Sequence, residues 1–263
     1  MGGLSTNRPR CDARFERALA RRGFGAVAGV DEAGRGSLFG PVVAAVVILS
    51  PEARLRGVRD SKELAPSRRE ELSLEIKVRA AAWAVGEASA AEIDRINIYQ
   101  ASRLAMKRAV LELRVLPDFL LVDALTVDLP LPQRALIKGD ARSRTIAAAS
   151  VVAKVHRDAC MREWDELYPQ YGLARGKGYG TPEHLAALEV FGPTAQHRFT
   201  FDPVGRFLPP RQMALALAVT APREASKNLG TLRAGSAGST SYRGAQACPP
   251  DFLTAPREAG GWR

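Results

Sequence analysis

The sequence predicts a mixed α/β fold. Three observations predict it: short apolar runs rich in β-branched residues, longer segments with helical spacing of apolar residues, and the alternation of the two along the chain. The 263 residues are 46% hydrophobic and 25% charged, which is enough for one substantial core with appendages.

The first third of the chain predicts a helix followed by three strands. Phe15 and Leu19 share a face at helical spacing, so a short helix is expected over residues 11–22. The strands expected from β-branched and apolar composition are Ala26–Val30, Val42–Leu49 and Trp83–Glu87.

Two capping boxes predict where helices begin. Ser67 and Glu70 form the first box, with Pro66 just ahead, so a helix is expected from there to about Ala80. Ser89 and Glu92 repeat the pattern. The amphipathic segment after them predicts a second helix that ends before Pro117.

The second half predicts two strands and a long helix. Phe119–Asp123 is a short apolar run that ends in a carboxylate, and Ala135–Lys138 is a further strand. Residues 143–167 have a helical pattern, and small residues near its start, such as Ala148, favour close packing against a sheet. Beyond Val204 the composition turns to Gly, Ser, Pro, Ala and Arg, so we expect disorder there except for a short helix at 212–219.

Charge and residue usage limit the functional class. A net charge of +10 and a pI near 10 suit a polyanionic partner such as a nucleic acid. Charge alone leaves a membrane surface or a ribosome open as well, and an arginine-rich tail could supply much of it. No apolar run reaches the ~20 residues of a membrane span, and the N-terminus does not resemble a signal peptide, so a cytoplasmic location and no membrane partner are expected. The three cysteines show no metal-ligand spacing with His156, His184 or His197, which predicts neither a disulfide nor a zinc site and gives the histidines structural roles.

Four carboxylates stand where chemistry is expected: Asp31, Glu32, Asp123 and Asp140. Three of them end a strand and the fourth lies just before a helix. Buried acids need a cation or a raised pKa, and oxygen ligands suit Mg²⁺ or Mn²⁺. Any single one could instead be a helix cap or an ion-pair partner. Because neighbouring residues on a strand point to opposite faces, Asp31 and Glu32 can share a site only if the strand ends or kinks between them.

The motifs resemble type 2 ribonuclease H, the ribonuclease HII family. The matching segments, in the family's order, are Gly29–Gly36, Gly40–Val43, Asp60–Lys62, Val122–Asp123, Lys138–Asp140, Ile146–Lys154, Arg157–Asp158, Gly176–Thr181 with His184, His197–Arg198 and Phe201–Val204. They cover about residues 24–204. Departures from the family pattern include Ser37–Gly40, where Pro-Leu-Ala-Gly is usual, and an extra acid at Asp128.

The resemblance implies a ribonuclease H-like fold, with a five-stranded mixed sheet flanked by helices and a C-terminal helical part. It places an N-terminal extension with a short helix at 1–23, the catalytic domain at 24–204 and a disordered basic tail at 205–263.

The resemblance also implies an activity. The expected substrates are RNA–DNA hybrid duplexes and DNA duplexes that contain single ribonucleotides, cut 5′ to the ribonucleotide to leave a 3′-hydroxyl and a 5′-phosphate. The expected cofactors are two Mn²⁺ or Mg²⁺ ions, held by the four acids above. The expected enzyme is a monomer.

Substrate contacts are implied by the same motifs. The backbone of Gly34, Arg35 and Gly36 and the hydroxyl of Tyr179 would meet the 2′-hydroxyl and its adjacent phosphate. Further phosphate contacts are expected from three lysines: Lys62, Lys154 and Lys177.

Two alternatives remain open at this stage. Ribonuclease HIII resembles the same core but carries an extra N-terminal domain, and about two dozen residues before the first strand leave no room for it. A non-catalytic nucleic-acid-binding module of the same fold is the other alternative, and the presence of all four acids argues against it.

Overall fold

The computed structural model describes residues 11–50, 52–53, 55, 57–58 and 64–207. Its helices are α1 (Arg14–Ala20), α2 (Pro66–Arg79), α3 (Ala90–Leu111), α4 (Arg144–Leu167), α5 (Leu173–Gly176) and α6 (Pro182–Phe191). Its strands are β1 (Val27–Ala33), β2 (Val42–Leu49), β3 (Ala80–Ala88), β4 (Phe119–Asp123) and β5 (Gln133–Leu136). Short 3₁₀ turns are η2 (Gly139–Ala141), η3 (Pro169–Tyr171) and η4 (Val204–Phe207). The predicted α/β class is confirmed.

The five strands form one mixed sheet in the order β3-β2-β1-β4-β5. β1 and β2 pair antiparallel, as do β2 and β3, whereas β4 runs parallel to β1 and β5 runs parallel to β4. β1 is therefore the central strand. Because β1 and β4 are parallel, their C-terminal ends lie at the same end of the sheet, and that end carries the predicted acids.

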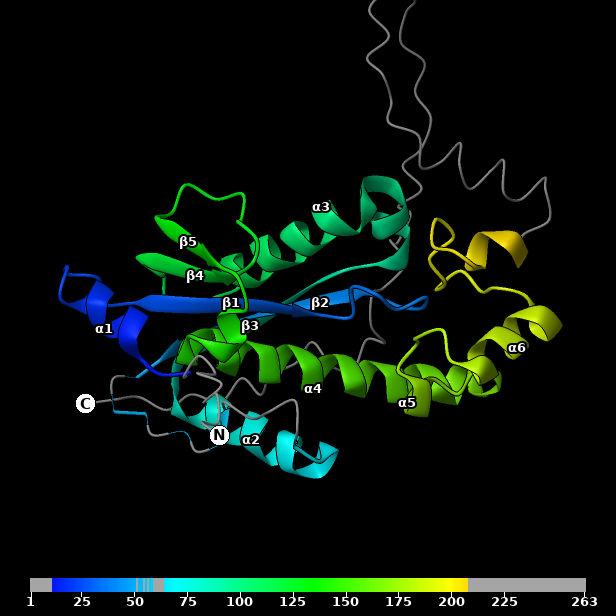
Figure 1. Ribbon diagram of the computed structural model, residues 1–263, viewed down its shortest axis with the longest axis horizontal. Coiled ribbons are helices and arrows are strands. Elements are labelled where there is room, and N and C mark those ends of the chain that lie inside the picture. Colours follow the sequence, from blue (N-terminus) through cyan, green and yellow to red (C-terminus); the bar gives the residue numbers. More distant parts are fainter. Residues whose placement is uncertain (1–10, 51, 54, 56, 59–63, 208–263) are drawn as a thin grey trace, which may run out of the picture.

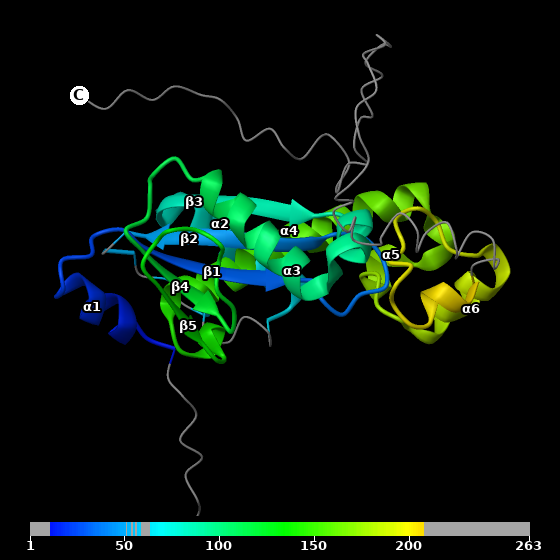
Figure 2. The same cartoon turned by 90° about the horizontal axis from the view of Figure 1, so that it is seen from above.

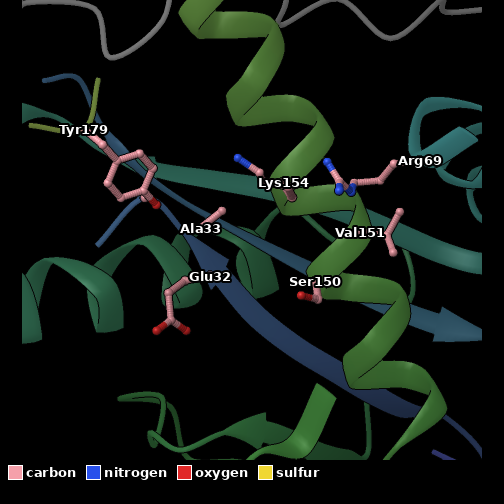
Figure 3. A pocket seen from close by; sticks show the side chains of 8 residues that line it. Glu32, Ala33, Arg69, Ser150, Val151, Lys154 and Tyr179 are labelled. Carbon is pink, nitrogen blue, oxygen red and sulfur yellow. The ribbon is translucent and has the colours of Figure 1, made fainter. Parts of the chain in front are cut away.

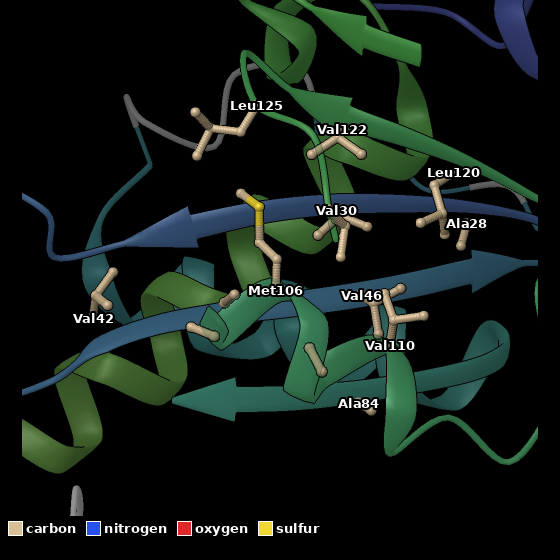
Figure 4. Close-up of a cluster of buried hydrophobic side chains, with 14 of the residues drawn as sticks. Ala28, Val30, Val42, Val46, Ala84, Met106, Val110, Leu120, Val122 and Leu125 are labelled. Atoms are coloured by element: carbon tan, nitrogen blue, oxygen red, sulfur yellow. The ribbon is translucent and has the colours of Figure 1, made fainter. Parts of the chain in front are cut away.

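Helices cover both faces of the sheet. Figure 1 shows α3 on one side of the strands and α4, with α2 behind it, on the other. Under α3, Met106 and Val110 pack against apolar side chains of the central strands, including Val30, Val46 and Val122 (Figure 4). This cluster removes apolar surface from water and fixes the strand ends relative to one another.

α4 lies unusually close to β1, as the small residues at its start predict. A Cβ atom placed on Gly29 would lie 2.1 Å from the carbonyl carbon of Thr145, so no other residue fits at that position of the strand. Ala147, Ala148 and Ala149 are almost fully buried in the same interface. This close contact sets the first turns of α4 directly beside the end of β1.

Several element boundaries differ from the sequence-based expectation. α2 starts at Pro66 with Ala65 as N-cap and no side-chain capping bond, so the predicted Ser67 capping box is wrong; the proline itself starts the helix. The Ser89 capping box of α3 is confirmed. α3 is kinked at Asn97, whose side-chain oxygen accepts from the Gln100 amide and caps the second part.

The predicted strand ends also shift. β1 continues to Ala33 rather than ending at Val30, β3 extends over Ala80–Ala88, and β5 is Gln133–Leu136, earlier than the expected Ala135–Lys138. Pairing with neighbours decides these limits, which local composition does not show.

The C-terminal helical part lies beyond the C-terminal end of β1. Figure 2 shows α5 and α6 at that end of the molecule and α1 at the other. Phe39 bridges to His197 in a short antiparallel contact, and Val204 of η4 is fully buried. Residues 205–207 of the expected tail thus belong to η4, while Lys62, the expected tail from 208 and its helix at 212–219 lie outside the described residues. No described helix is long and apolar enough to cross a membrane.

Candidate active site

Asp31 and Glu32 lie beside a notch at the end of the sheet. β1 pairs with β2 as far as Ala33, but its pairing with β4 stops at Val30 opposite Val122. Among the described strands, the β4 side of β1 is therefore open where the two acids stand. The sequence led us to expect that β1 ends or kinks between Asp31 and Glu32, but β1 continues through both residues. Its pairing with β4 stops before them, so side chains from both faces of β1 can enter the same space.

Asp31, Glu32 and Asp123 influence one another electrostatically. Burial raises the pKa of Asp31 well above its usual range, and the charges of Glu32 and Asp123 raise it further. A hydrogen bond with Ser150 of α4 opposes this rise. Burial also raises the pKa of Glu32, against the lowering effect of Arg35 and with a further rise from Asp123. Three carboxylates thus repel one another in a poorly solvated space.

Asp123 joins the end of β4 to the turn that carries Asp140. Its Oδ1 accepts a hydrogen bond from the Gly139 amide at 2.7 Å. Asp140 is the next residue, in η2, and its Oδ1 accepts from the Ala141 amide at 2.9 Å. Lys138 precedes this turn in the left-handed conformation (φ 55°), which reverses the chain so that η2 returns to β4. Asp123 and Asp140 are 17 residues apart in the sequence, and this turn brings the segment of Asp140 back to the end of β4.

The notch has the chemistry of a divalent-cation site. Glu32 Oε2 is buried and has no hydrogen-bond partner among the described residues, while Glu32 Oε1 lies 3.1 Å from Arg35 Nη1. A buried carboxylate oxygen without a partner is costly unless a cation binds it. Carboxylate oxygens are the ligands that Mg²⁺ and Mn²⁺ prefer. The residues present therefore fit a hard divalent ion.

A cavity of about 270 Å³ opens next to Glu32. Its lining residues come from β1 and the turn after it, from α2 and α4, and from the loop before α6: Glu32, Ala33, Gly34, Arg69, Ser150, Val151, Lys154 and Tyr179. Figure 3 shows Ser150 and Lys154 on successive turns of α4, with Tyr179 across the cavity from them. Arg69 was not predicted as a site residue, because only the fold brings α2 to the end of β1. For Ser150 the small residues around it in the sequence favoured a packing role over a contact with nucleic acid.

Residues Gly34–Gly36 form the turn after β1, which we call the glycine turn. Arg198, whose side chain is fully buried, holds this turn in place. Its guanidinium donates to the carbonyls of Gly34 and Arg35, each at 2.7 Å, and to the Gly40 carbonyl at 3.0 Å. In a trans peptide the C=O and the next N–H point in opposite directions. The amides of Arg35 and Gly36 therefore point away from Arg198, and such a row of amides favours an anion or a hydroxyl oxygen.

Arg157 of α4 connects the same turn to the segment of Tyr179. It is also fully buried, and it donates to Ser37 Oγ at 2.6 Å and to the Lys177 carbonyl at 3.0 Å. Its guanidinium carbon lies 5.7 Å from the centre of the Tyr179 ring. Gly34 adopts φ +89°, and a Cβ there would lie 1.9 Å from Arg157 Nε, so this glycine is required for both reasons.

Tyr179 and two of the predicted lysines lie at this side of the site. The Tyr179 side chain is 40% exposed, and its Cε1 would be 3.9 Å from a Cβ on Gly36. Lys154 Nζ forms an ion pair with Asp158 at 2.6 Å and lines the cavity. Lys177 does not line the cavity. Burial lowers the pKa of Lys177, the charge of Asp158 opposes this, and the charges of Arg162 and Lys154 lower the pKa further.

A second group of potential ligands lies on α4 and β3. Glu87 Oε1 and His156 Nε2 are 2.7 Å apart, and Cys160 Sγ is 3.9 Å from the same oxygen. The three atoms lie within 4.8 Å of one another. Cys160 is disulfide-bonded, contrary to the expectation of no disulfide, so its sulfur is not a free thiolate ligand. Sequence spacing did not predict this group, because Glu87 is distant in the chain and only the packing of α4 on the sheet brings it near.

Comparison with known proteins decides the family. A family model for ribonuclease HII matches residues 28–204, which is more than half of the chain. The chain belongs to the ribonuclease HII family. As a member of that family it is a metal-dependent endoribonuclease, a hydrolase that acts on nucleic acid. The matched region contains all four acids, the glycine turn and Tyr179.

Individual relatives agree with the family match. Ribonuclease HII of Solibacter usitatus is 60% identical over 195 residues, covering 74% of this chain and 86% of the relative. The crystal structure of ribonuclease H2 from Pyrococcus horikoshii superposes with a TM-score of 0.62 at 26% identity, covering 72% of this chain and 99% of that one. A Bst-RNase HIII structure in complex with Mn²⁺ shares the fold (TM-score 0.58, 20% identity, 78% of this chain and 74% of that one).

Proposed function

We propose that this ribonuclease HII cleaves the RNA strand of RNA–DNA hybrids and cuts 5′ to single ribonucleotides in duplex DNA, leaving a 3′-hydroxyl and a 5′-phosphate. The observation that supports the proposal is the notch in which the charge of Asp123 raises the pKa of both Asp31 and Glu32. Such a group of acids is stable as a set of anions only with cations present. The amide-lined glycine turn and Tyr179 lie next to it.

We propose that two Mn²⁺ or Mg²⁺ ions bind to Asp31, Glu32, Asp123 and Asp140. Asp31 and Asp123 would form the shared centre of the site, because Asp123 ends β4 and Asp31 lies near the C-terminal end of the neighbouring parallel strand β1. The Mn²⁺ complex of the fold relative is consistent with this cofactor class. Bound ions would activate the attacking water and stabilise the leaving 3′ oxygen.

The protein's own contribution beyond the acids is to select a ribonucleotide. The outward amides of Arg35 and Gly36 can donate to the 2′-hydroxyl or its adjacent phosphate, and the 2′-hydroxyl is the group that distinguishes RNA from DNA. The exposed ring of Tyr179 faces the same side and can lie against the sugar. A DNA strand would leave these donors without the hydroxyl partner.

The nearby lysines would contact phosphates. Lys154 lines the cavity, so we propose that it exchanges its ion pair with Asp158 for a substrate phosphate. Lys177 is next to Gly178 and Tyr179 in the chain and would contact the strand further along. For Lys62 the same role stays a prediction from the sequence.

The proposal is tested with a duplex DNA that holds one ribonucleotide, incubated with the enzyme and Mn²⁺ or Mg²⁺. We expect a single nick 5′ to the ribonucleotide and a phosphate on the downstream fragment, with no cut in an all-DNA duplex. Binding without a nick would support the alternative of a non-catalytic module. Cleavage of long hybrids alone would contradict the single-ribonucleotide part of the proposal.

A further inference from the structure

Two buried histidines outside the acid site contact each other directly. His184 in α6 and His197 in the following loop are 1% and 0% exposed, and their Nε2 atoms lie 3.0 Å apart. Two ring nitrogens at this distance form a hydrogen bond only if one carries the proton and the other a lone pair. The pair must therefore hold two different tautomers.

The contacts of His197 fix its tautomer. The Thr194 amide lies 2.9 Å from His197 Nδ1, and an amide N–H can only donate. Nδ1 of His197 is therefore the acceptor, and its proton is on Nε2. That proton points at His184.

The tautomer of His184 follows. Its Nε2 accepts from His197, so its proton is on Nδ1, which lies 3.0 Å from the carbonyl oxygen of Tyr179. A directional chain of hydrogen bonds therefore runs from the Thr194 amide through both rings to Tyr179. The Thr194 hydroxyl oxygen also lies 3.0 Å from His197 Nδ1 and can donate to it in this arrangement. A proton added to His184 would place two donors face to face at the contact between the Nε2 atoms, and a proton added to His197 would place Nδ1–H against the Thr194 amide.

The surroundings favour this neutral chain. The rings of Phe39 and Tyr171 lie edge-on to His197, with ring centres 4.9 and 4.8 Å away. Burial lowers the pKa of both histidines, for His197 to about 3. The pair is thus neutral and its hydrogen-bond direction is fixed.

We propose that His184 and His197 are positioning residues that orient Tyr179 for contact with the ribose. Tyr179 stands between Gly178, at φ +73°, and Gly180, so its own backbone restrains it weakly. The Tyr179 carbonyl accepts from the Thr181 amide at 2.8 Å as well as from His184, and these two bonds fix its peptide plane. That plane restrains the backbone from which the ring extends toward Gly36. This inference rests on the sugar contact of the proposed function.

The tautomers are measured first, on the wild-type protein and without substrate. The chain has three histidines, so long-range ¹H–¹⁵N spectra with His184→Gln and His197→Gln variants assign each ring. We expect the Nδ1–H tautomer for His184 and the Nε2–H tautomer for His197. Both rings in the same tautomer, or either ring charged at neutral pH, would overturn the proposal whatever the enzyme cleaves.

The effect on Tyr179 is measured by amide hydrogen exchange over 178–181. His197→Phe keeps an aromatic ring but has no donor, whereas His197→Gln retains a side-chain amide that can donate to His184. We expect exchange to rise roughly tenfold in the phenylalanine variant, as for the loss of one hydrogen bond, and to stay near wild type in the glutamine variant. Equal exchange in all three proteins would contradict the proposal.

The functional consequence is measured in a double-mutant cycle on the single-ribonucleotide duplex. We expect His197→Phe to raise KM and lower cleavage roughly tenfold in the wild-type background, and to have no further effect when Tyr179→Ala is present. Equal losses in both backgrounds would show a merely structural role. An unchanged cleavage rate in Tyr179→Ala alone would instead contradict the proposed contact of Tyr179 with the sugar. The tautomer and hydrogen-exchange measurements do not depend on that contact.

Discussion

Asp123 accepts a hydrogen bond from the amide of Gly139 at 2.7 Å, and this contact ties the last residue of β4 to the turn that carries Asp140. One carboxylate oxygen of Asp123 therefore has a structural task, and its charge also raises the pKa values of Asp31 and Glu32. The two tasks can be separated by substitution.

Asp123→Asn should abolish turnover and leave duplex binding largely intact. The amide oxygen of asparagine can still accept from Gly139, so the turn keeps its place, but the charge needed to hold a cation is lost. Because each 1.4 kcal/mol is tenfold in rate, a loss of several kcal/mol lowers cleavage on the order of 10³-fold or more. Asp128→Asn is the matched control, since Asp128 is exposed and pairs only at the surface with Lys107. Cleavage that survives in Asp123→Asn would remove this residue from the metal site.

Tyr179→Ala should lower cleavage at a lone ribonucleotide by roughly 5–30-fold, the equivalent of one or two kcal/mol of lost contact. Tyr179→Phe separates the ring from the hydroxyl: it retains the packing against the sugar and loses only the polar contact. Initial rates on duplexes with one ribonucleotide and with four in a row distinguish the contributions. A rate unaffected by the alanine substitution speaks against contact with the sugar.

Arg198→Met should lower the free energy of unfolding by about 3 kcal/mol or more. The guanidinium donates to the buried carbonyls of Gly34 and Gly40 and to the partly buried carbonyl of Arg35, and each buried polar group left without a partner costs about 1–3 kcal/mol. Urea denaturation measures the effect. Arg206→Met is the control, because its ion pair with Asp202 is exposed and is worth about 0–1 kcal/mol. Equal stabilities for the two variants would show that the glycine turn does not depend on Arg198.

The stability of the folded protein should depend on pH through His197. Its pKa is 6.5 in the unfolded chain and about 3 in the folded protein. Between these values the unfolded state binds a proton that the folded state does not, so the free energy of unfolding falls as pH falls. This one group contributes up to about 1.4 kcal/mol per pH unit. Above pH 6.5 the contribution is complete and constant.

The difference between wild type and His197→Gln isolates that contribution. Denaturation at several pH values from 7 to 4 should give curves that converge toward low pH, because the glutamine variant has no proton to gain at that position. Parallel curves would mean that His197 titrates normally in the folded protein.

Sequence reasoning predicted the class of fold correctly and singled out the four acids as candidate ligands, because both depend on local signals. A carboxylate at the end of an apolar run, such as Asp123, is visible without any structure, and so is the Ser89 capping box. The resemblance to ribonuclease HII added the sheet and the expected activity. The position of the first strand's end was wrong, since whether β1 continues past Val30 depends on pairing with β2.

Other features depend on contacts between distant segments. Arg157 and Arg198 are buried cations, a rare state that no composition rule anticipates. The His184–His197 bond forms only when α6 folds back on the following loop, and the Glu87–His156–Cys160 group forms only when α4 packs on the sheet. The spacing of these residues in the sequence does not predict that they come into contact.

The central claim is that Asp31, Glu32, Asp123 and Asp140 form one divalent-cation site, and Mn²⁺ binding measured by calorimetry tests it most directly. The wild-type protein should bind Mn²⁺ more tightly as pH rises, because protons compete with the metal for carboxylates whose pKa values are raised. Each single substitution to Asn or Gln should weaken that binding by roughly tenfold or more, and Asp128→Asn should not. Mn²⁺ affinity equal to wild type in all four variants would contradict the claim.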